Sequence, residues 1–368
     1  MNAYVKRDLY LNRLIVRRDN GQIKAVTGPR RSGKSFLLDP IYKDYLLSKG
    51  VPEDNIIIIS FDIEDEDTPQ ELLDREKLKE YLYSRIASQT ENYYIFLDEI
   101  QEVDGFERIV NGLNKHQNVD VYVTGSNSKF LSSEINTIFR GRSDEVCVLP
   151  FTFREFCQDR QESVNDLWKE YYTYGGLPAL RKMPTAEQKT TYLQKLWKKT
   201  YLDDVVERHN VENREALEAI ADALCSSIGS LTNTTRITNT LGSVRKIKIT
   251  DDTVAKYIGY LEEAFLFNEA RRYNIKGNKY YENIKKYYSI DVGLRNARLN
   301  YRQLEQTHLM ENIIFNELLY RGYVVDVGVV EHRKMVDGKS EYKQYEVDFL
   351  ATEGNEKNYI QSAYETDT

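Results

Sequence analysis

The sequence is poor in cysteine, in histidine and in long apolar runs. It contains three cysteines (Cys147, Cys157 and Cys225) and four histidines, and no two cysteines have CxxC spacing. This scarcity argues against a disulfide framework, a structural zinc site and a histidine metal cluster, and it fits a reducing cytoplasm. The best apolar run, "IIII" at 56–59, is far shorter than the roughly 20 residues that span a bilayer. The N-terminus also lacks the apolar stretch of a signal peptide. We therefore expect a cytoplasmic protein with no membrane partner.

The composition is otherwise that of a folded protein with an uneven charge. The 368 residues predict two or three domains, and 41% hydrophobic residues suffice for packed cores. The net charge is −7, yet residues 236–302 hold 14 Lys and Arg against 7 Asp and Glu. That segment therefore carries +7 and the rest of the chain −14, so a polyanion would be attracted to the segment and repelled elsewhere.

A glycine-rich stretch, "GPRRSGKS" at 28–35, fits the pattern G-x-x-x-x-G-K-[ST]. We expect a buried strand before it and a helix after it, so that the loop turns its N–H groups toward a phosphate. Lys34 would reach the β- and γ-phosphates, and the Ser35 hydroxyl would bind Mg²⁺. The expected nucleotide contacts are Gly28, Pro29, Arg30, Arg31, Ser32, Gly33, Lys34, Ser35 and Phe36. A simple glycine-rich turn is the alternative, and the strand–loop–helix context disfavours it.

A second motif supplies the acids that a phosphate loop needs. In "NYYIFLDEI", 92–100, a buried strand is expected to end at Asp98 and Glu99. Asp98 would hold Mg²⁺ through water, and Glu99 would be the base that polarises the attacking water. Two solvated acids at a strand end are the alternative for this motif taken alone. Together the two motifs predict binding of ATP or GTP, and the adjacent glutamate favours hydrolysis.

A third apolar run, "VDVYVTGSNS" at 119–128, again predicts a strand followed by a polar turn. Thr124, Ser126 and Asn127 could contact the γ-phosphate or its water. Arg140 and Arg142 follow an expected helix end, where a cation could stabilise transition-state charge. A surface or helix-capping role is the equally weighted alternative for both arginines.

These stretches together resemble the prokaryotic AAA+-related ATPases. The resemblance rests on "GPRRSGKS", "IFLDEIQ", "VTGSNS", "FRGR", "LPFTFREF" and "YGGLP", which occur in this order. It implies an ATPase core with the ASCE type of strand order, a small helical lid around "GGLP", a polar sensor in "TGSN" and a restriction-endonuclease-like region after the ATPase. It implies no biological role, and it leaves open whether Arg140 and Arg142 act within one chain or on a neighbour.

The basic segment lies in a pattern of three helices followed by a hairpin, which predicts a winged helix-turn-helix. The helix over 250–266 would read DNA, with Thr253, Lys256, Tyr257 and Tyr260 on its exposed face. The hairpin, with its turn at Gly277–Asn278, would be the wing. Its lysines alternate with tyrosines, a pairing that suits phosphate contact and base stacking: Lys276, Lys279, Lys285 and Lys286 with Tyr280, Tyr281, Tyr287 and Tyr288. Ordinary strand tyrosines, or a winged helix that docks a protein, are the alternatives.

The C-terminal stretch has the outline of a metal nuclease with a degraded motif. A helix with Glu317, for which Glu311 is a rival, precedes a strand with Asp348. Where a glutamate and a lysine are expected, the chain has Gln361 and Ala363, so an active nuclease is not expected unless Lys343 or Lys357 takes the lysine's place. The predicted vestigial site is Glu317, Asp348 and Gln361.

The sequence thus predicts an α/β P-loop NTPase core of AAA+-like, ASCE type, followed by a winged helix and a partial restriction-endonuclease-like α/β domain. The expected bounds are 1–158 for the core, 159–202 for the lid, 203–302 for the winged helix and 303–368 for the last domain. The leading hypothesis is an ATPase that uses ATP and Mg²⁺. The alternatives are a nucleotide-gated module that binds double-stranded DNA with little turnover, and an ATP-dependent nuclease.

Overall fold

A computed structural model describes residues 4–62, 70–125, 137–139, 141–336 and 339–363. The chain forms two compact units, Met1–Leu149 and Pro150–Thr368, and each is described by itself. Among the helices described, none has the length and apolar character needed to cross a membrane.

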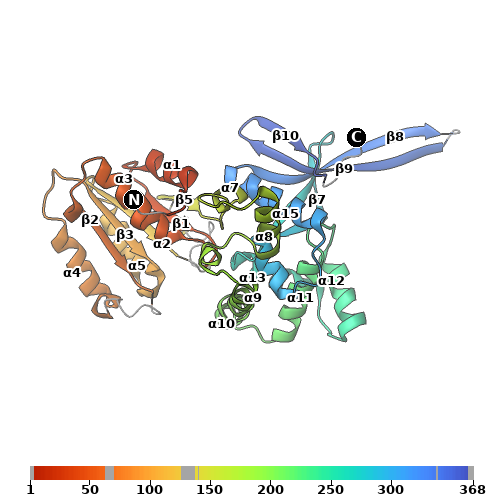
Figure 1. Ribbon diagram of the computed structural model, residues 1–368, viewed down its shortest axis with the longest axis horizontal. Coiled ribbons are helices and arrows are strands. Elements are labelled where there is room, and N and C mark those ends of the chain that lie inside the picture. Colours follow the sequence, from red (N-terminus) through yellow and green to blue (C-terminus); the bar gives the residue numbers. More distant parts are fainter. Residues whose placement is uncertain (1–3, 63–69, 126–136, 140, 337–338, 364–368) are drawn as a thin grey trace. The chain divides into compact units, whose positions relative to one another are not determined.

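The N-terminal unit is built on a five-stranded parallel sheet with the order β2-β3-β4-β1-β5 (Figure 1). The strands are β1 Ile23–Thr27, β2 Ile56–Ser60, β3 Tyr93–Asp98, β4 Val119–Thr124 and β5 Ser143–Cys147. Most of their residues are buried, as expected for strands covered by helices on both faces. The strand β4 lies between β1, which leads into the phosphate loop, and β3, which ends in the acids. The ASCE order and the P-loop NTPase core are therefore confirmed.

Helices cover both faces of this sheet. One face packs against α4 Arg75–Arg85 and α5 Phe106–Leu113, which bury their apolar side chains on Ile95, Val121 and their neighbours. The other face packs against the helix that follows the phosphate loop, where the ring of Tyr42 contacts those of Phe96 and Tyr122. That helix runs as α2 Lys34–Phe36, a π-helical stretch Leu37–Tyr42 and α3 Lys43–Ser48. The helix α1 Asp8–Arg17 precedes β1, and short 3₁₀ turns occupy Glu53–Asn55, Gln70–Leu73 and Ile100–Glu102.

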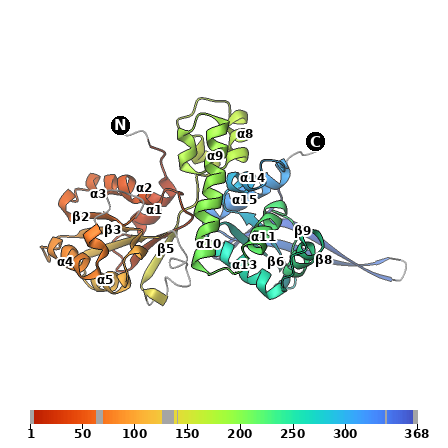
Figure 2. The same ribbon diagram turned by 90° about the horizontal axis from the view of Figure 1, so that it is seen from below.

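The C-terminal unit holds a second five-stranded sheet, with the order β10-β9-β8-β6-β7. Its strands are β6 Phe267–Asn274, β7 Lys279–Ser289, β8 Val324–Val336, β9 Lys339–Glu353 and β10 Glu356–Ile360. The strands β8 and β9 continue beyond the others as a long two-stranded ribbon (Figures 1 and 2). The helix α15 Gln306–Arg321 packs on one face through Phe315 and Leu318, which contact Val325, Val327 and Phe349.

The remaining helices of this unit share one hydrophobic core. That core joins Leu193 and Trp197 of the expected lid to Leu217, Ile258 and Phe267 of the expected winged helix. The helices are α7 Phe153–Phe156, α8 Val164–Tyr174, α9 Ala186–Lys195, α10 Asp203–Arg208, α11 Arg214–Ser226, α12 Thr234–Thr240, α13 Asp251–Glu263 and α14 Val292–Arg298. Between α9 and α10 the π-helical stretch Leu196–Leu202 continues the same rod (Figure 2), so the expected boundary at 202/203 falls inside a helix.

The expected boundaries at 158/159 and 302/303 also differ from the structure. The first unit ends at Leu149, because the "LPFTFREF" stretch already packs with the second unit. The three helices α11, α12 and α13 and the β6–β7 hairpin occur in the expected order, but β6 pairs in parallel with β8. The hairpin is therefore part of the C-terminal sheet rather than a separate wing, and one sheet spans the expected boundary at 302/303.

The "GGLP" stretch binds the start of α14 rather than forming an exposed lid turn. The N–H of Gly176 donates to Oδ2 of the buried Asp291 at 2.7 Å, and Asp291 caps α14 by accepting from the N–H of Leu294 at 3.0 Å. A Cβ on Gly176 would collide with the carbonyl oxygen of Phe151, so the residue must be glycine here. Burial raises the pKa of Asp291 to about 6.

Candidate active site at the phosphate loop

The loop between β1 and α2 has the conformation that its glycines permit. Gly28 has φ +126° and Gly33 has φ +92°, both in the region that side chains with a Cβ rarely adopt. At Gly28 a Cβ would also meet the carbonyl oxygen of Val148, the residue after β5. The two glycines therefore fix the bend that brings the loop onto the start of α2. Phe36, which is also expected to contact the nucleotide, is the last residue of α2 and is 48% exposed.

Lys34 turns back into this loop. The residue is 4% exposed, and its Nζ donates to the carbonyl oxygens of Gly28 at 3.2 Å and Pro29 at 3.1 Å. Burial lowers the pKa of Lys34, and the nearby Glu99 and Asp98 carboxylates offset part of that decrease. The ammonium group is thus held at the mouth of the loop by acceptors that a phosphate oxygen could replace.

Asp98 is the last residue of β3, which is separated from β1, the strand that leads into the phosphate loop, by β4. Its Oδ1 accepts from the hydroxyl of Thr124 at 2.5 Å, and its carboxylate also accepts from the Ser35 side chain. Burial raises the pKa of Asp98, Glu99 raises it further, and the hydrogen bonds from Thr124 and Ser35 lower it in part. The structure therefore brings Ser35, Asp98 and Thr124 together as one hydrogen-bonded group of oxygen ligands.

Glu99 has an unusual backbone, with φ 51° and ψ 40°, in the left-handed region. Its N–H donates to the Thr124 hydroxyl at 2.9 Å, and its Oε2 accepts from the Gln101 amide at 2.5 Å. A non-glycine residue in this region is held there by its surroundings. Thr124, for which a contact with the γ-phosphate or its water is predicted, bonds through its hydroxyl to both Asp98 and Glu99.

Sequence reasoning missed a buried arginine that supports the loop. Arg7 is 3% exposed, and its guanidinium donates to the carbonyl oxygens of Ser32 at 3.0 Å and Leu149 at 2.8 Å. It precedes α1 and lies far from the motif in sequence. No spacing rule could have identified it, because only the folded chain places it under the loop.

Arg142 does not reach this site within its own chain. Its carbonyl oxygen accepts from the N–H of Ile23, the first residue of β1, whereas Gly28 follows the last residue of that strand. At about 3.3 Å per residue, the strand separates Arg142 from the phosphate loop by about 16 Å. Of the roles left open for Arg142, action on the phosphate loop of its own chain is therefore disfavoured, and action on a neighbouring chain or a surface role stays a prediction. Ser126, Asn127 and Arg140 lie outside the described residues.

The C-terminal acids form a different arrangement from the expected one. Glu311, the rival, is buried on the sheet side of α15 and accepts from Lys286 Nζ at 3.0 Å and from the Tyr288 hydroxyl at 2.6 Å. Glu317 instead pairs with Arg321 on its own helix, because position 317 does not share a face with Glu311 and Phe315. Asp348 and Gln361 are neighbours, since the N–H of Asp348 lies 3.4 Å from the Gln361 Oε1.

The lysine beside these acids comes from an unexpected strand. Lys286 of β7 pairs with Glu311 and, at 2.8 Å, with Glu346. Burial alone would lower the pKa of Lys286, but the two carboxylates raise it overall. Lys343 and Lys357 lie over the rings of Tyr345 and Tyr273 instead. Within the described part of the chain, no group of three or more His, Cys, Asp or Glu residues is placed to hold a metal ion.

Several of the expected DNA contacts are buried or already paired. Tyr257 on α13 is 6% exposed. Lys286, Tyr287 and Tyr288 are also buried, because they lie in the buried C-terminal part of β7. Lys285 pairs with Glu269 at 2.5 Å. The expectation of exposed DNA contacts is therefore wrong for the buried residues Tyr257, Lys286, Tyr287 and Tyr288, whereas the partly exposed Lys285 stays a prediction. Thr253 is half-buried and bonds to the N-cap residue of α13. Of the expected DNA contacts, Lys256, Lys276 and Lys279 are exposed.

The surface next to α12 and α13 is acidic rather than basic. A cavity of about 520 Å³ lies between these helices and the β6–β7 hairpin, and four carboxylates line it against one lysine: Asp251, Glu262, Glu269 and Glu282 against Lys285. Burial, with Glu269 nearby, raises the pKa of Glu262 to about 7. The lining repels a polyanion, so the expected reading helix does not present a basic face at this cavity.

The loop geometry, the parallel sheet and the paired acids define a P-loop nucleotide-binding domain of AAA type. Residues 20–157 match the family model described as an AAA domain, and residues 165–305 match one described as a domain of unknown function. Among solved structures, the ORC1 protein of Aeropyrum pernix in complex with DNA has a TM-score of 0.33 at 13% identity, covering 82% of this chain and 94% of that chain. PCH-2 of Caenorhabditis elegans has a TM-score of 0.31 at 13% identity, covering 70% and 65%.

Two relatives match nearly the whole chain. An uncharacterised protein of Haemophilus influenzae is 35% identical, covering 99% of this chain and 88% of that protein. An uncharacterised protein of Methanocaldococcus jannaschii is 29% identical, covering 94% of this chain and 75% of that protein. The chain belongs to the family of the Haemophilus influenzae protein, and an AAA-type ATP-binding domain is its N-terminal unit.

Proposed function

We propose that this protein is a Mg²⁺-dependent ATPase that hydrolyses ATP to ADP and phosphate. One observation carries the proposal: Ser35, Asp98, Glu99 and Thr124 form a single hydrogen-bonded group at the end of the loop that holds Lys34. A loop that binds phosphates, a carboxylate beside a hydroxyl, and a second carboxylate are the parts that phosphoryl transfer to water requires.

The residues present fit a magnesium ion. Mg²⁺ prefers oxygen ligands and commonly uses one carboxylate with a Ser or Thr hydroxyl and phosphate oxygens. Ser35 and Asp98 supply such a pair and already contact one another. The raised pKa of Asp98 indicates a buried carboxylate without enough positive charge, which a divalent cation would correct. When bound, the ion neutralises charge that develops on the phosphate oxygens.

The residues also fit a triphosphate. The Lys34 ammonium is bonded to two loop carbonyls, and a phosphate oxygen offers it a stronger, charged acceptor. The helix that begins at Lys34 directs its first N–H groups at the same place. Glu99 would then orient and polarise the attacking water, while Thr124 holds the Glu99 backbone and Gln101 its carboxylate.

Two substitutions separate binding from hydrolysis. Lys34→Ala should abolish ATP binding, and Glu99→Gln should retain binding but reduce turnover by about 100-fold or more, as expected for loss of a general base. Lys115→Ala and Glu80→Gln, which change exposed residues of the same unit, serve as matched controls. Binding is measured by calorimetry with Mg·ATP and turnover by phosphate release. Parental hydrolysis by Glu99→Gln would refute the base assignment, and no heat from the parent protein would refute the proposal itself.

Duplex DNA remains a second candidate partner, on one observation. Lys276 and Lys279 are exposed at the turn between β6 and β7, beside the exposed Tyr280 ring. If they contact phosphates, duplex binding should weaken steeply with salt, and the double variant Lys276→Ala/Lys279→Ala should lower the salt dependence by about two counterions. A mobility shift that is absent at low salt, or unchanged in the double variant, would remove this candidate.

A further inference from the structure

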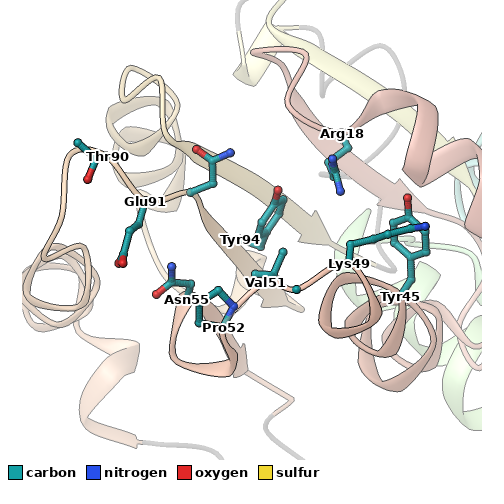
Figure 3. Close-up of a pocket in the computed structure, with 11 residues that line it drawn as sticks. Arg18, Tyr45, Lys49, Val51, Pro52, Asn55, Thr90, Glu91 and Tyr94 are labelled. Atoms are coloured by element: carbon teal, nitrogen blue, oxygen red, sulfur yellow. The ribbon is translucent and has the colours of Figure 1, made fainter.

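The N-terminal unit has a pocket at the edge of its sheet opposite to the phosphate loop. The pocket has a volume of about 630 Å³, within the range of small-molecule sites. It lies where β2 and β3 begin and where α1 and α3 end (Figure 3). The phosphate loop follows β1 at the opposite end of the same parallel sheet, so at least the length of a strand, about 16 Å, separates the two sites.

We propose that this pocket binds a small organic phosphate that carries a planar polar group, for which a nucleoside monophosphate is the simplest probe. The assignment rests on three kinds of side chain that face one cavity: two cations, a buried amide and an aromatic ring. It is independent of the ATPase assignment, because none of these residues belongs to the phosphate loop or its acids.

The cations are Arg18 and Lys49. Each follows the last residue of a helix, and Figure 3 shows both on one side of Tyr94. Arg18 pairs with Asp19 at 3.1 Å, which leaves most of its five donors for another acceptor. Lys49 is exposed, lies 5.4 Å from the centre of the Tyr45 ring and has no ion pair with a residue of the described chain. Two cations, Arg18 and Lys49, stand against one carboxylate, Glu91, among the residues that line the pocket. Guanidinium and ammonium groups are the side chains that recognise phosphate.

The amide belongs to Asn55, on the other side of Tyr94 in Figure 3. Asn55 is only 7% exposed, and its side-chain amide makes no hydrogen bond with another described residue. Because Asn55 lines the pocket, its amide is open to a ligand there. An amide offers a donor and an acceptor side by side, which matches the edge of a planar polar group such as a nucleobase.

The floor of the pocket is rigid. The Tyr94 hydroxyl donates to Asp19 at 3.3 Å, the Asp19 N–H donates to Asp120 Oδ2 at 3.0 Å, and Asp120 also accepts from Tyr122 at 2.7 Å. Asp120 forms an ion pair with the buried Lys24 of β1. A site whose walls are already ordered loses little entropy on binding.

The test is calorimetry on the full chain carrying Lys34→Ala, which removes the phosphate-loop site from the measurement. AMP should bind with a stoichiometry of one, and Arg18→Gln and Lys49→Gln should each weaken it by about tenfold or more. Asn55→Asp, which keeps the size of the side chain and adds a negative charge, should weaken it similarly. Lys79→Gln, an exposed lysine on α4, is the matched control and should leave affinity unchanged.

Inorganic phosphate and adenosine separate the two halves of the ligand. Both should bind more weakly than AMP, because each fills only part of the site. No heat from AMP at millimolar concentration would overturn the proposal, as would AMP affinity that neither Arg18→Gln nor Lys49→Gln changes. Phosphate that bound as tightly as AMP would refute the planar group, and adenosine that bound as tightly would refute the anion. Unchanged thermal unfolding of each variant would show that lost binding is not lost folding.

Discussion

The position of Thr124 leads to a sharp test of the site. Its hydroxyl donates to Asp98 at 2.5 Å and accepts from the Glu99 N–H at 2.9 Å, so one side chain fixes both acids. Thr124→Val keeps the shape of the residue on the buried strand β4 and removes both hydrogen bonds. Because Asp98 and Glu99 keep their own side chains, any loss of turnover would come from their position and protonation.

The size of the effect follows from the two bonds. A hydrogen bond to a charged group contributes about 1.5–3 kcal/mol, and one between neutral groups about 1 kcal/mol. If about 2 kcal/mol of this is expressed in the transition state, kcat/KM falls about 30-fold. The Thr124 bond also lowers the pKa of Asp98 against the effect of burial, so its loss should raise that pKa further. Asp98 must be ionised to act, so activity is lost as the pH falls, and the acid limb of the pH profile should move to higher pH.

The assay is steady-state phosphate release from Mg·ATP between about pH 5 and pH 9, where kcat/KM reports groups of the free enzyme. Thr124→Ser, which restores the hydroxyl, should recover most of the lost rate, and Thr90→Val, an exposed residue, should have no effect. Turnover within twofold of the parent in Thr124→Val, together with an unmoved acid limb, would refute the positioning role. A variant that lost rate but was not rescued by serine would refute it equally.

Three further outcomes are expected. Arg7→Ala should weaken ATP binding by about tenfold, because the buried guanidinium that holds the Ser32 carbonyl is lost. Arg85→Ala, at an exposed helix end, is the control and should leave ATP binding unchanged. Equal ATP affinities of the two variants in calorimetry would contradict this role of Arg7. Glu311→Ala should lower the free energy of unfolding by about 3 kcal/mol, because Lys286 and Tyr288 each lose a hydrogen-bond partner. Glu317→Ala, which removes only a surface ion pair, should change it by less than about 0.5 kcal/mol. Equal losses of stability in urea unfolding would show that Glu311 is not a buried partner. Burial raises the pKa of Asp291 from the ordinary 3.8 to about 6 in the folded state, so its contribution to stability is greatest below about pH 4 and is lost as the pH rises to about 6. Asp291→Asn should remove that slope from the pH dependence of Tm. An identical slope in the variant would contradict the assignment.

The phosphate loop could be predicted because its chemistry is local. Gly28, Gly33, Lys34 and Ser35 lie within eight residues, and each is required by backbone geometry or by a phosphate contact that its neighbours determine. The end of β3 at Asp98 and Glu99 was predictable for a related reason, since a continuous apolar run predicts a buried parallel strand and its carboxyl end predicts the site. These two segments predicted the class of the core, and the order of its strands was predicted from the family resemblance.

Other residues depend on register and facing, which one sequence does not reveal. Arg142 belongs to the "FRGR" stretch of the family resemblance, but the pairing of β5 with β1 places it beside the start of β1, at the end of the strand away from the phosphate loop. Tyr257 and Lys286 lie on elements that were correctly expected, yet their side chains turn inward because α13 and β7 pack on layers that come from distant segments. Arg7 and Asn55 carried no signal, since their importance comes from what the fold places around them.

The charge of the buried Glu311 is balanced from outside the expected C-terminal motif. The chain has Gln361 and Ala363 where the motif would have an acid and a lysine, so the motif itself provides no cation for Glu311. Lys286, from a strand that precedes α15, lies between Glu311 and Glu346 and supplies that charge from within the chain. A buried carboxylate requires a counter-charge, and Lys286 is that counter-charge for Glu311 in the folded chain. The Lys286 ion pairs therefore join the helix α15 to the strands β7 and β9 of the C-terminal sheet.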